Sequence, residues 1–255
     1  MTAIQGARER ARREVTAAIM DEARRRLAVD GAAKLSLRAV ARELGMVSSA
    51  LYRYFPSRDD LLTALIVEAY DALGEAAEGA LDAAPRSAPA ERWVAVCVGV
   101  RAWALAHPHE FALIHGTPVP GYAAPPDTNA PGGRVPFALA RVAREAAEDG
   151  LLGPVPGGPL PDALADEARA LVEEHAPGVS APVMAAVVAS WAQLVGLVGF
   201  EVFGQFTGVI ERSRAELFAH QARRLAEGAG LPPNSTPAPA VSWATAPHPK
   251  SSPRY

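Results

Sequence analysis

The stretch GMVSSALYRYFPSRDDLL, residues 45–62, interleaves aromatic residues and arginines within a few positions of a glycine. Aromatic side chains usually lie inside a protein and arginines outside. A short helix that carries both needs buried anchors on one side and a polar surface on the other. Pro56 stops the helix, and Ser57 with Asp60 three residues later is typical of the start of the next one.

Residues 36–55 fit a helix–turn–helix, in which two short helices cross at small residues and join at a glycine. The spacing predicts helices over 37–44 and 48–55, with Gly45 between them. The positions that would face inward are occupied by small or apolar residues: Val40, Ala41, Leu44, Met46, Leu51 and Tyr54. The match covers both helices and the turn, so it is more specific than a lone glycine turn.

The remaining side chains of the second helix suit the major groove of DNA. A reading helix needs short hydrogen-bonding groups at its start and phosphate binders on its flanks. Ser48 and Ser49 stand at the start, and Ala50 is small enough to approach a thymine methyl group. Tyr52 and Arg53 lie on the outer side. We therefore interpret this helix as a DNA-recognition helix.

Two further arginines flank the recognition helix. Arg58 stands in the first turn of the following helix, and Arg38 in the first turn of the preceding one. Free N–H groups in a first helical turn attract phosphate, and a guanidinium adds charge-assisted hydrogen bonds. We expect both arginines to bind DNA phosphates.

The segment SLRAVARELGMVSSALYRYFPSRDDLLTAL, within residues 10–70, resembles the DNA-binding domain of the TetR family of bacterial repressors. The resemblance implies an all-α homodimer with a ligand-responsive C-terminal domain. It places the family's DNA contacts on Arg38, Ser48, Ser49, Ala50, Tyr52, Tyr54 and Arg58. Many members carry Ser where this chain has Val47, so we expect helix capping to pass to Ser48.

The segment RAWALAHPHEFALIHG, residues 101–116, resembles the subgroup of TetR C-terminal domains named for Trp, His and Gly. Aromatic residues and a histidine concentrate on the helices expected at 90–107, 109–116 and 182–207. We expect them to line a pocket for a largely apolar small-molecule effector: Trp93, Trp103, Phe111, His115 and Trp191. Ordinary core packing of the tryptophans, with the cavity elsewhere, is the alternative.

Helical periodicity runs through most of the chain, and strand alternation is nearly absent, so the predicted fold is all-α. We expect Gly31 to end the first helix, and a helix at about 134–149 to follow an irregular Pro/Gly-rich segment at 117–133. We expect a three-helix DNA-binding domain at 8–56, a connecting helix at 57–84, an effector-binding and dimerisation domain at 85–229, and a disordered Pro/Ser/Ala-rich tail at 230–255.

The most apolar helix, expected at 182–207, predicts a homodimer. It contains Gly196, Gly199 and Gly204, which favour close approach by another helix. We expect it to form a four-helix bundle between two copies, together with the helix at 211–228. Val198 and Val202 are the expected contacts between the copies.

Charge distribution supports a DNA-binding N-terminus. The net charge is −3, but residues 1–60 hold twelve Arg or Lys against eight Asp or Glu. The remaining residues hold thirteen against twenty, so a basic head precedes an acidic body. Such asymmetry favours a head that alone meets double-stranded DNA. A sequence-nonspecific DNA-binding protein is the alternative, although such proteins usually carry basic charge over a broad surface.

Other function classes find little support. The chain lacks GxSxG, HExxH and phosphate-loop motifs, so we do not expect an enzyme. The histidines of HPHE, residues 107–110, are poorly spaced for a metal site, and we expect neither metal nor cofactor. With Cys97 as the single cysteine and no uninterrupted membrane-length apolar run, we expect a cytoplasmic protein without a membrane span.

Overall fold

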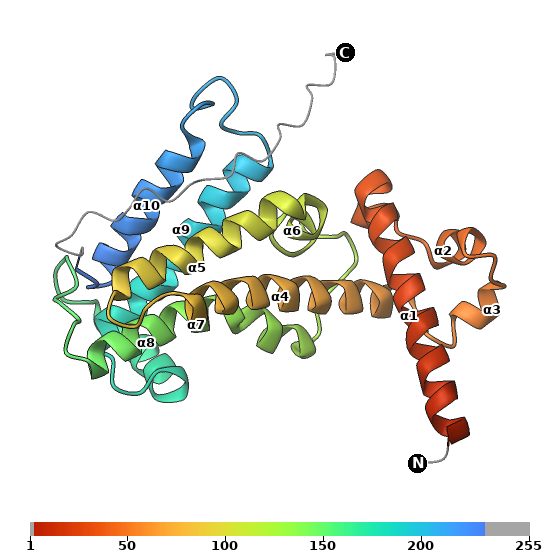
Figure 1. Ribbon diagram of the computed structural model, residues 1–255, viewed down its shortest axis with the longest axis horizontal. Helices are drawn as coiled ribbons and strands as arrows, with labels where there is room; N and C mark the ends of the chain where they lie inside the picture. The colour runs from red at the N-terminus through yellow and green to blue at the C-terminus, as the bar shows by residue number, and fades with distance from the viewer. Residues whose placement is uncertain (1–2, 233–255) are drawn as a thin grey trace.

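A computed structural model describes residues 3–232, and within that range every regular element is a helix (Figure 1). The all-α prediction is confirmed. A small head at one end is joined to a larger helical body through one long helix, α4 (Arg58–Ala83). The disordered tail expected at 230–255 falls, beyond residue 232, outside the described residues.

The head is built from three helices and the first turns of α4. These helices are α1 (Ala3–Asp30), α2 (Leu37–Glu43) and α3 (Ser48–Leu51), with a 3₁₀ turn, η1 (Ala32–Lys34), after α1. Their inward faces form a single cluster whose most deeply buried members are Ile19, Ala23, Val40, Ala41, Leu51, Leu61 and Leu62. Leucines of α4 thus complete the head core, so the connecting helix is part of the head.

Two glycines end helices of the head as expected. Gly31 follows α1 with φ 77°, and Gly45 follows α2 with φ 65°, both in the left-handed region that side chains with a Cβ avoid. At the second site the N–H of Met46 donates to the carbonyl of Ala41 at 2.9 Å. This closing bond sets the turn between α2 and α3.

The recognition helix α3 is shorter than the predicted 48–55. Regular α-helix ends at Leu51, and tighter bonds follow, with the N–H of Tyr54 donating to the carbonyl of Leu51 at 2.8 Å. Pro56 ends the segment at Phe55, because a proline disfavours helical backbone in the residue before it, but it does not account for the change to tighter turns after Leu51.

Val47 is the N-cap of α3, with an extended backbone and no side-chain capping bond. Ser48 is therefore the first helical residue, and the expectation that it caps the helix is wrong. Its hydroxyl remains available for other contacts.

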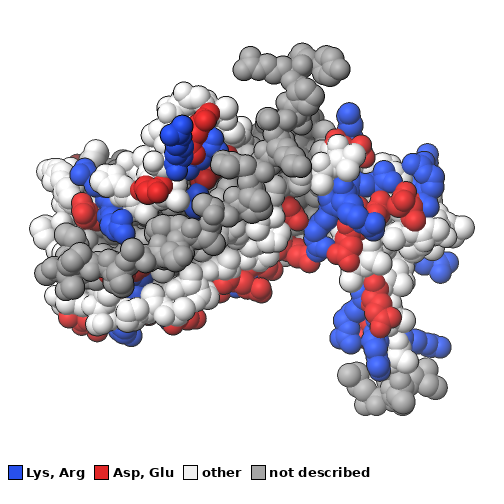
Figure 2. Space-filling model, turned by 45° about the horizontal axis from the view of Figure 1, so that its top comes forward, with Lys and Arg blue, Asp and Glu red and all other residues white. Residues whose placement is uncertain are grey.

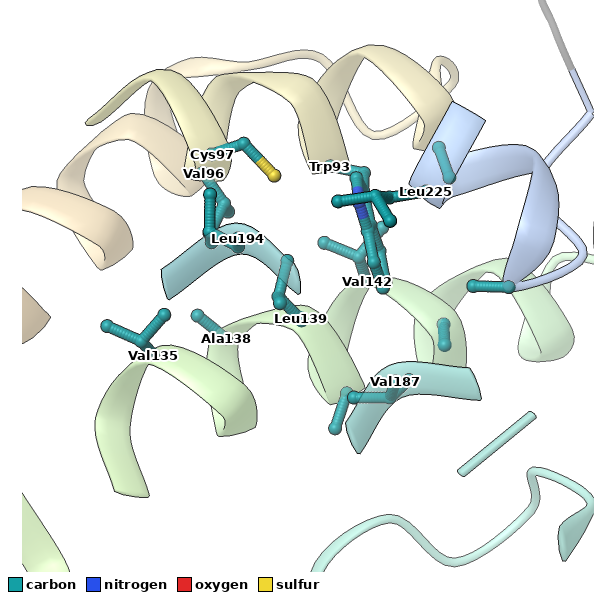
Figure 3. Close-up of a cluster of buried hydrophobic side chains, with 14 of the residues drawn as sticks. Trp93, Val96, Cys97, Val135, Ala138, Leu139, Val142, Val187, Leu194 and Leu225 are labelled. Atoms are coloured by element: carbon teal, nitrogen blue, oxygen red, sulfur yellow. The ribbon is translucent and has the colours of Figure 1, made fainter. Parts of the chain in front are cut away.

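The body contains six helices within the described range: α5 (Pro89–Ala106), α6 (Pro108–His115), α7 (Asn129–Glu148), α8 (Asp162–His175), α9 (Ala181–Val202) and α10 (Arg214–Gly228). A short 3₁₀ turn, η2 (Pro126–Thr128), precedes α7. Their shared core joins α5, α7, α9 and α10 around Trp93, Cys97, Leu139, Leu194 and Leu225 (Figure 3). Burial raises the pKa of Cys97 to about 12, so this thiol stays protonated.

Two boundaries in the body differ from the predictions. α7 begins at Asn129, five residues before the expected 134, because Pro131 lies in its first turn, where the missing N–H costs no helical bond. α9 ends at Val202 instead of 207. Gly204 has φ 72° and lies beyond the helix, so it cannot serve as a helix-packing glycine.

Candidate DNA-binding face and ligand cavity

The α3 segment, residues 48–55, has exposed polar residues on one side and buried apolar residues on the other. Leu51 is 1% exposed and Phe55 is 7% exposed, and both anchor the segment in the head core. Between them Tyr52 and Arg53 point outward, and Ser49 is exposed at the start of the helix. The alternation of anchors and exposed polar groups expected from the sequence is present in the structure.

Arg38 and Tyr54, on either side of α3, differ in how exposed they are and in what they contact. Arg38 is exposed and forms no ion pair with any residue that the structure describes. Tyr54 is half-buried against the head core, and the guanidinium carbon of Arg12 lies 5.6 Å from the centroid of its ring. Arg38 can therefore reach a phosphate, whereas the ring of Tyr54 mainly supports the segment.

Arg58 is engaged within the head. Its guanidinium donates to the carbonyls of Ala32 at 2.9 Å, Ala33 at 3.2 Å and Leu35 at 3.1 Å. These carbonyls belong to η1 and the residue after it, so Arg58 ties the start of α4 to the linker between α1 and α2. In this conformation Nε and Nη2 of Arg58 hold the head together, and Nη1, which lies 3.5 Å from a carboxylate oxygen of Asp59, is the nitrogen left for the expected phosphate contact.

A cavity of about 720 Å³ lies in the body, between α4, α7, α8, α9 and the segment that joins α6 to α7. Apolar residues such as Ile66, Phe137 and Val187 dominate its wall, and Tyr70, Tyr122 and His175 add polar groups. No Asp, Glu, Lys or Arg lines it among the described residues. The size and the lining suit a small neutral molecule.

Most of the residues predicted to line the pocket do not line this cavity. Of the five, Trp191 lines the cavity. Trp93 and Phe111 are fully buried in the core of the body, and Trp103 stacks on His107 with ring centroids 5.0 Å apart. Trp93 therefore packs in the core, as the alternative for the tryptophans expects, and Phe111 does so as well, because large aromatic rings fill the space where several helices meet.

His115 lies behind the wall of the cavity. Its ring contacts Phe111 at 5.0 Å and Tyr70, a lining residue, at 5.8 Å between centroids. Burial lowers the pKa of His115 to about 4, so the ring is neutral near pH 7.

Sequence reasoning missed the contribution of α7 and α8. Gly132, Pro136 and Phe137 of α7 line the cavity, as do Leu171 and His175 of α8. Because proline has no N–H, the carbonyl of Gly132 lacks its usual helical donor four residues later. A proline within an amphipathic helical pattern is the signal that could have marked this wall.

The cavity and the head share part of one wall. Leu113, Val119 and Tyr122 line the cavity and also pack against the core of the head. The hydroxyl of Tyr122 lies 2.9 Å from the hydroxyl of Thr63, in the second turn of α4. A change of shape in this segment would therefore displace side chains that contact the core of the head.

Arg134 ties α7 to α4 on another side of the cavity. Its guanidinium binds Glu78 with two hydrogen bonds and Asp71 with one to the carboxylate, which raises the pKa of Arg134. The adjacent Gly132 and Gly133 line the cavity. Movement of this part of α7 would therefore act on the long helix that enters the head.

Comparisons with known proteins match both parts of the chain. A family model described as bacterial regulatory proteins, tetR family, matches residues 19–65, and one described as tetracyclin repressor-like, C-terminal domain, matches residues 93–225. The HTH-type transcriptional regulators Rv1816 of Mycobacterium tuberculosis and Mb1846 of Mycobacterium bovis are each 37% identical over 221 residues, which is 86% of this chain and 94% of theirs.

Solved structures show the same fold. SCO4313, described as a regulatory protein, has a TM-score of 0.70 and 30% identity, over 86% of this chain and 98% of its own. The TetR family regulator PfmR of Thermus thermophilus has a TM-score of 0.54 and 18% identity, over 82% of this chain and 97% of its own. The second likeness shows the fold alone.

Proposed function

Given that this chain belongs to the TetR family of transcriptional regulators, which are not enzymes, we propose that it is a dimeric repressor released from DNA by a small neutral ligand. The observation that carries the DNA-binding part is the polar edge of α3. Ser48, Ser49 and Ala50 form its front, and the buried Leu51 and Phe55 fix its position.

The proposed contacts divide into base reading and positioning. Ser48 and Ser49 offer hydroxyls to base edges, and Ala50 contacts a thymine methyl group. Arg38, Tyr52 and Arg53 are exposed beside this front and bind phosphates. Arg58 acts through the carbonyls that it holds, by fixing α4 against the rest of the head.

The outer face of α9 supports a dimer. Val188, Ala192, Gly196 and Phe200 follow one another at four-residue spacing along this face, and Val188 and Phe200 are its exposed large side chains. A Cβ built on Gly196 meets nothing within 4 Å, so a second helix can approach there. α9 is long and apolar enough to cross a membrane, and only 33% of its most apolar stretch is buried within this chain. A second copy of the chain would cover this surface.

The sequence-based choice of Val198 as a contact between copies was wrong. Val198 is 0% exposed and packs in the core of its own chain. Packing through the α9 stripe would relate two heads by twofold symmetry, so the operator should be near-palindromic.

The cavity supports a neutral ligand with one hydrogen-bond donor. A charged ligand would lose its hydration without an opposite charge in the wall, which is costly. The carbonyl of Gly132, which has no N–H to accept from at Pro136, is a hydrogen-bond acceptor in the wall. Ligand entry would shift Tyr122 and the Arg134 contacts, and so favour a separation of the heads that no longer fits the operator.

A neutral fluorescent amine, N-phenyl-1-naphthylamine, tests the cavity. It carries one N–H donor, and its emission should rise and shift to shorter wavelength on binding. Leu171→Trp should narrow the cavity and weaken binding at least roughly tenfold, because Leu171 lines it. Leu164→Trp is the matched control, an exposed leucine of the same helix that is absent from the lining. Equal binding by the two variants would refute the assignment.

A further inference from the structure

One face of α1 packs against the core of the head. Toward the N-terminus, where that core ends, the same face changes from apolar to basic. Ile19, Ala23 and Leu27 are buried along this face. Seven residues, or about two turns, before Ile19 the same face carries Arg12, and about one turn before that it carries Arg8; both arginines are exposed. Beyond the head core, the face of α1 that carries Ile19 is therefore exposed and positively charged.

The contact between Arg12 and Tyr54 shows where this basic face lies. The guanidinium carbon of Arg12 is 5.6 Å from the centroid of the Tyr54 ring, within the range of a cation–π interaction. Tyr54 follows α3 directly, so Arg12 stands beside the end of the helix that is proposed to read DNA. Arg8 lies one turn farther out, about 6 Å along the helix axis.

Neither arginine is neutralised within the residues that the structure describes. Arginines in the second half of α1 form ion pairs, Arg24 with Asp21 and Glu68, and Arg26 with Glu22 and Glu43, whereas Arg10 and Arg13 form none with the described residues. Arg8 and Arg12 form none with the described residues. Figure 2 shows Lys and Arg side chains along the projecting part of α1 and over the rest of the head. Two like charges four residues apart repel each other, and an opposing polyanion would remove that cost.

We propose that the projecting part of α1 binds the DNA backbone beside the groove read by α3, with Arg8 and Arg12 contacting phosphates. This inference rests on the proposed docking of α3 on DNA. Phosphate contacts carry no base information, so α1 would lengthen the footprint and strengthen binding on every sequence.

Binding to a random-sequence duplex of about 30 base pairs tests the proposal, with affinity measured across a salt series. The pair R8Q/R12Q removes two charges from the inward face. The matched control R10Q/R13Q removes two charges from the same segment, with Arg10 on the opposite face and Arg13 on a flank. The overall charge change is identical, so only the position differs. Circular dichroism should show equal helix content for both variants.

R8Q/R12Q should reduce the slope of log affinity against log salt by about 1.8 for each bound head, and so by about 3.6 for the dimer, or about 150-fold less weakening between about 50 and 200 mM salt. R10Q/R13Q should keep the wild-type slope, and R8K/R12K should retain most of it, because lysine also binds phosphate. Equal slopes in both glutamine pairs would overturn the proposal. A wild-type protein that binds no DNA would overturn the proposed function itself, and this inference with it.

Discussion

At the scale of single residues, Arg58 has the most informative surroundings. Its side chain is 29% exposed and holds three carbonyls of the linker between α1 and α2. Hydrogen bonds from a charged donor are each stronger than neutral ones, and lysine cannot reproduce the forked geometry. Arg58 thus fixes the angle between α4 and the reading helices.

Arg58→Ala should lower the free energy of unfolding of the protein by about 1–3 kcal/mol. Thermal or urea unfolding followed by circular dichroism measures the change. Arg53→Ala is the control, since Arg53 is exposed and forms no side-chain bond to the described residues, and it should stay within about 0.5 kcal/mol of wild type. Equal stability of the two variants would show that the carbonyl contacts of Arg58 do not stabilise the head.

His115 should make stability depend on pH. Burial lowers its pKa from 6.5 to about 4, so the unfolded chain takes up a proton at a higher pH than the folded chain does. The stability from neutral His115 is therefore present above pH 6.5 and lost as the pH falls toward 4. Tyr70 and Phe111 face the ring, and neither supplies a charge in this range.

Urea midpoints at about pH 7 and about pH 4.5 test this assignment. The midpoint of wild type should fall more between these two values than that of His115→Gln, which removes the titrating group. His220→Gln on the exposed face of α10 should behave like wild type. An unchanged pH dependence in His115→Gln would contradict the assignment.

Residue patterns that act locally were predictable from the sequence. The Ser57 hydroxyl accepts the N–H of Asp60 at 3.1 Å, as the capping pattern predicts. The role of Trp93 was not predictable, because a tryptophan on an apolar helix face has the same pattern whether it fills a core or lines a cavity. Packing among α5, α7 and α10 decides between the two.

At the scale of helices, the stripe on α9 carries the dimer proposal. Phe200 is 51% exposed and Val188 is 40% exposed, and burying one such side chain contributes about 1.5–3 kcal/mol. A charge placed there would instead lose hydration at the contact. The effect should appear in assembly, since neither side chain belongs to the core of its own chain.

Phe200→Glu should convert a dimer to a monomer at micromolar concentration; Val188 is left unchanged because it also lines the cavity. Multi-angle light scattering measures the mass directly. Val29→Glu, at an 84% exposed valine on the head, should leave the dimer intact. A wild-type protein that is already monomeric under these conditions would exclude the proposed interface.

Helix ends show what sequence can and cannot define. Gly31 and Gly45 each restrict the backbone locally, so the ends of α1 and α2 were close to prediction, whereas α3 ends four residues before the predicted position. The start of α7 was misjudged because Pro and Gly at 131–133 read as a loop. A proline in a first turn and the packing of Gly132 against Tyr70 allow helix there.

At the scale of the whole molecule, the head and the cavity are connected at two places. α4 runs from the head core into the body and is tied to α7 by Arg134. The segment after α6 places Tyr122 between the cavity and the head. Sequence patterns predicted the head and its helix–turn–helix but not the cavity, because the wall of the cavity comes from distant segments that meet only in the folded chain.

Selection of genomic DNA fragments by the intact protein tests the central claim most directly. The protein should enrich a near-palindromic motif whose half-sites lie one helical turn, about 10 base pairs, or a multiple of it apart. Ser49→Ala should change the bases preferred within each half-site and leave their spacing unchanged. Recovered fragments with no shared motif, bound as tightly as random DNA, would contradict a sequence-specific regulator that reads DNA through α3.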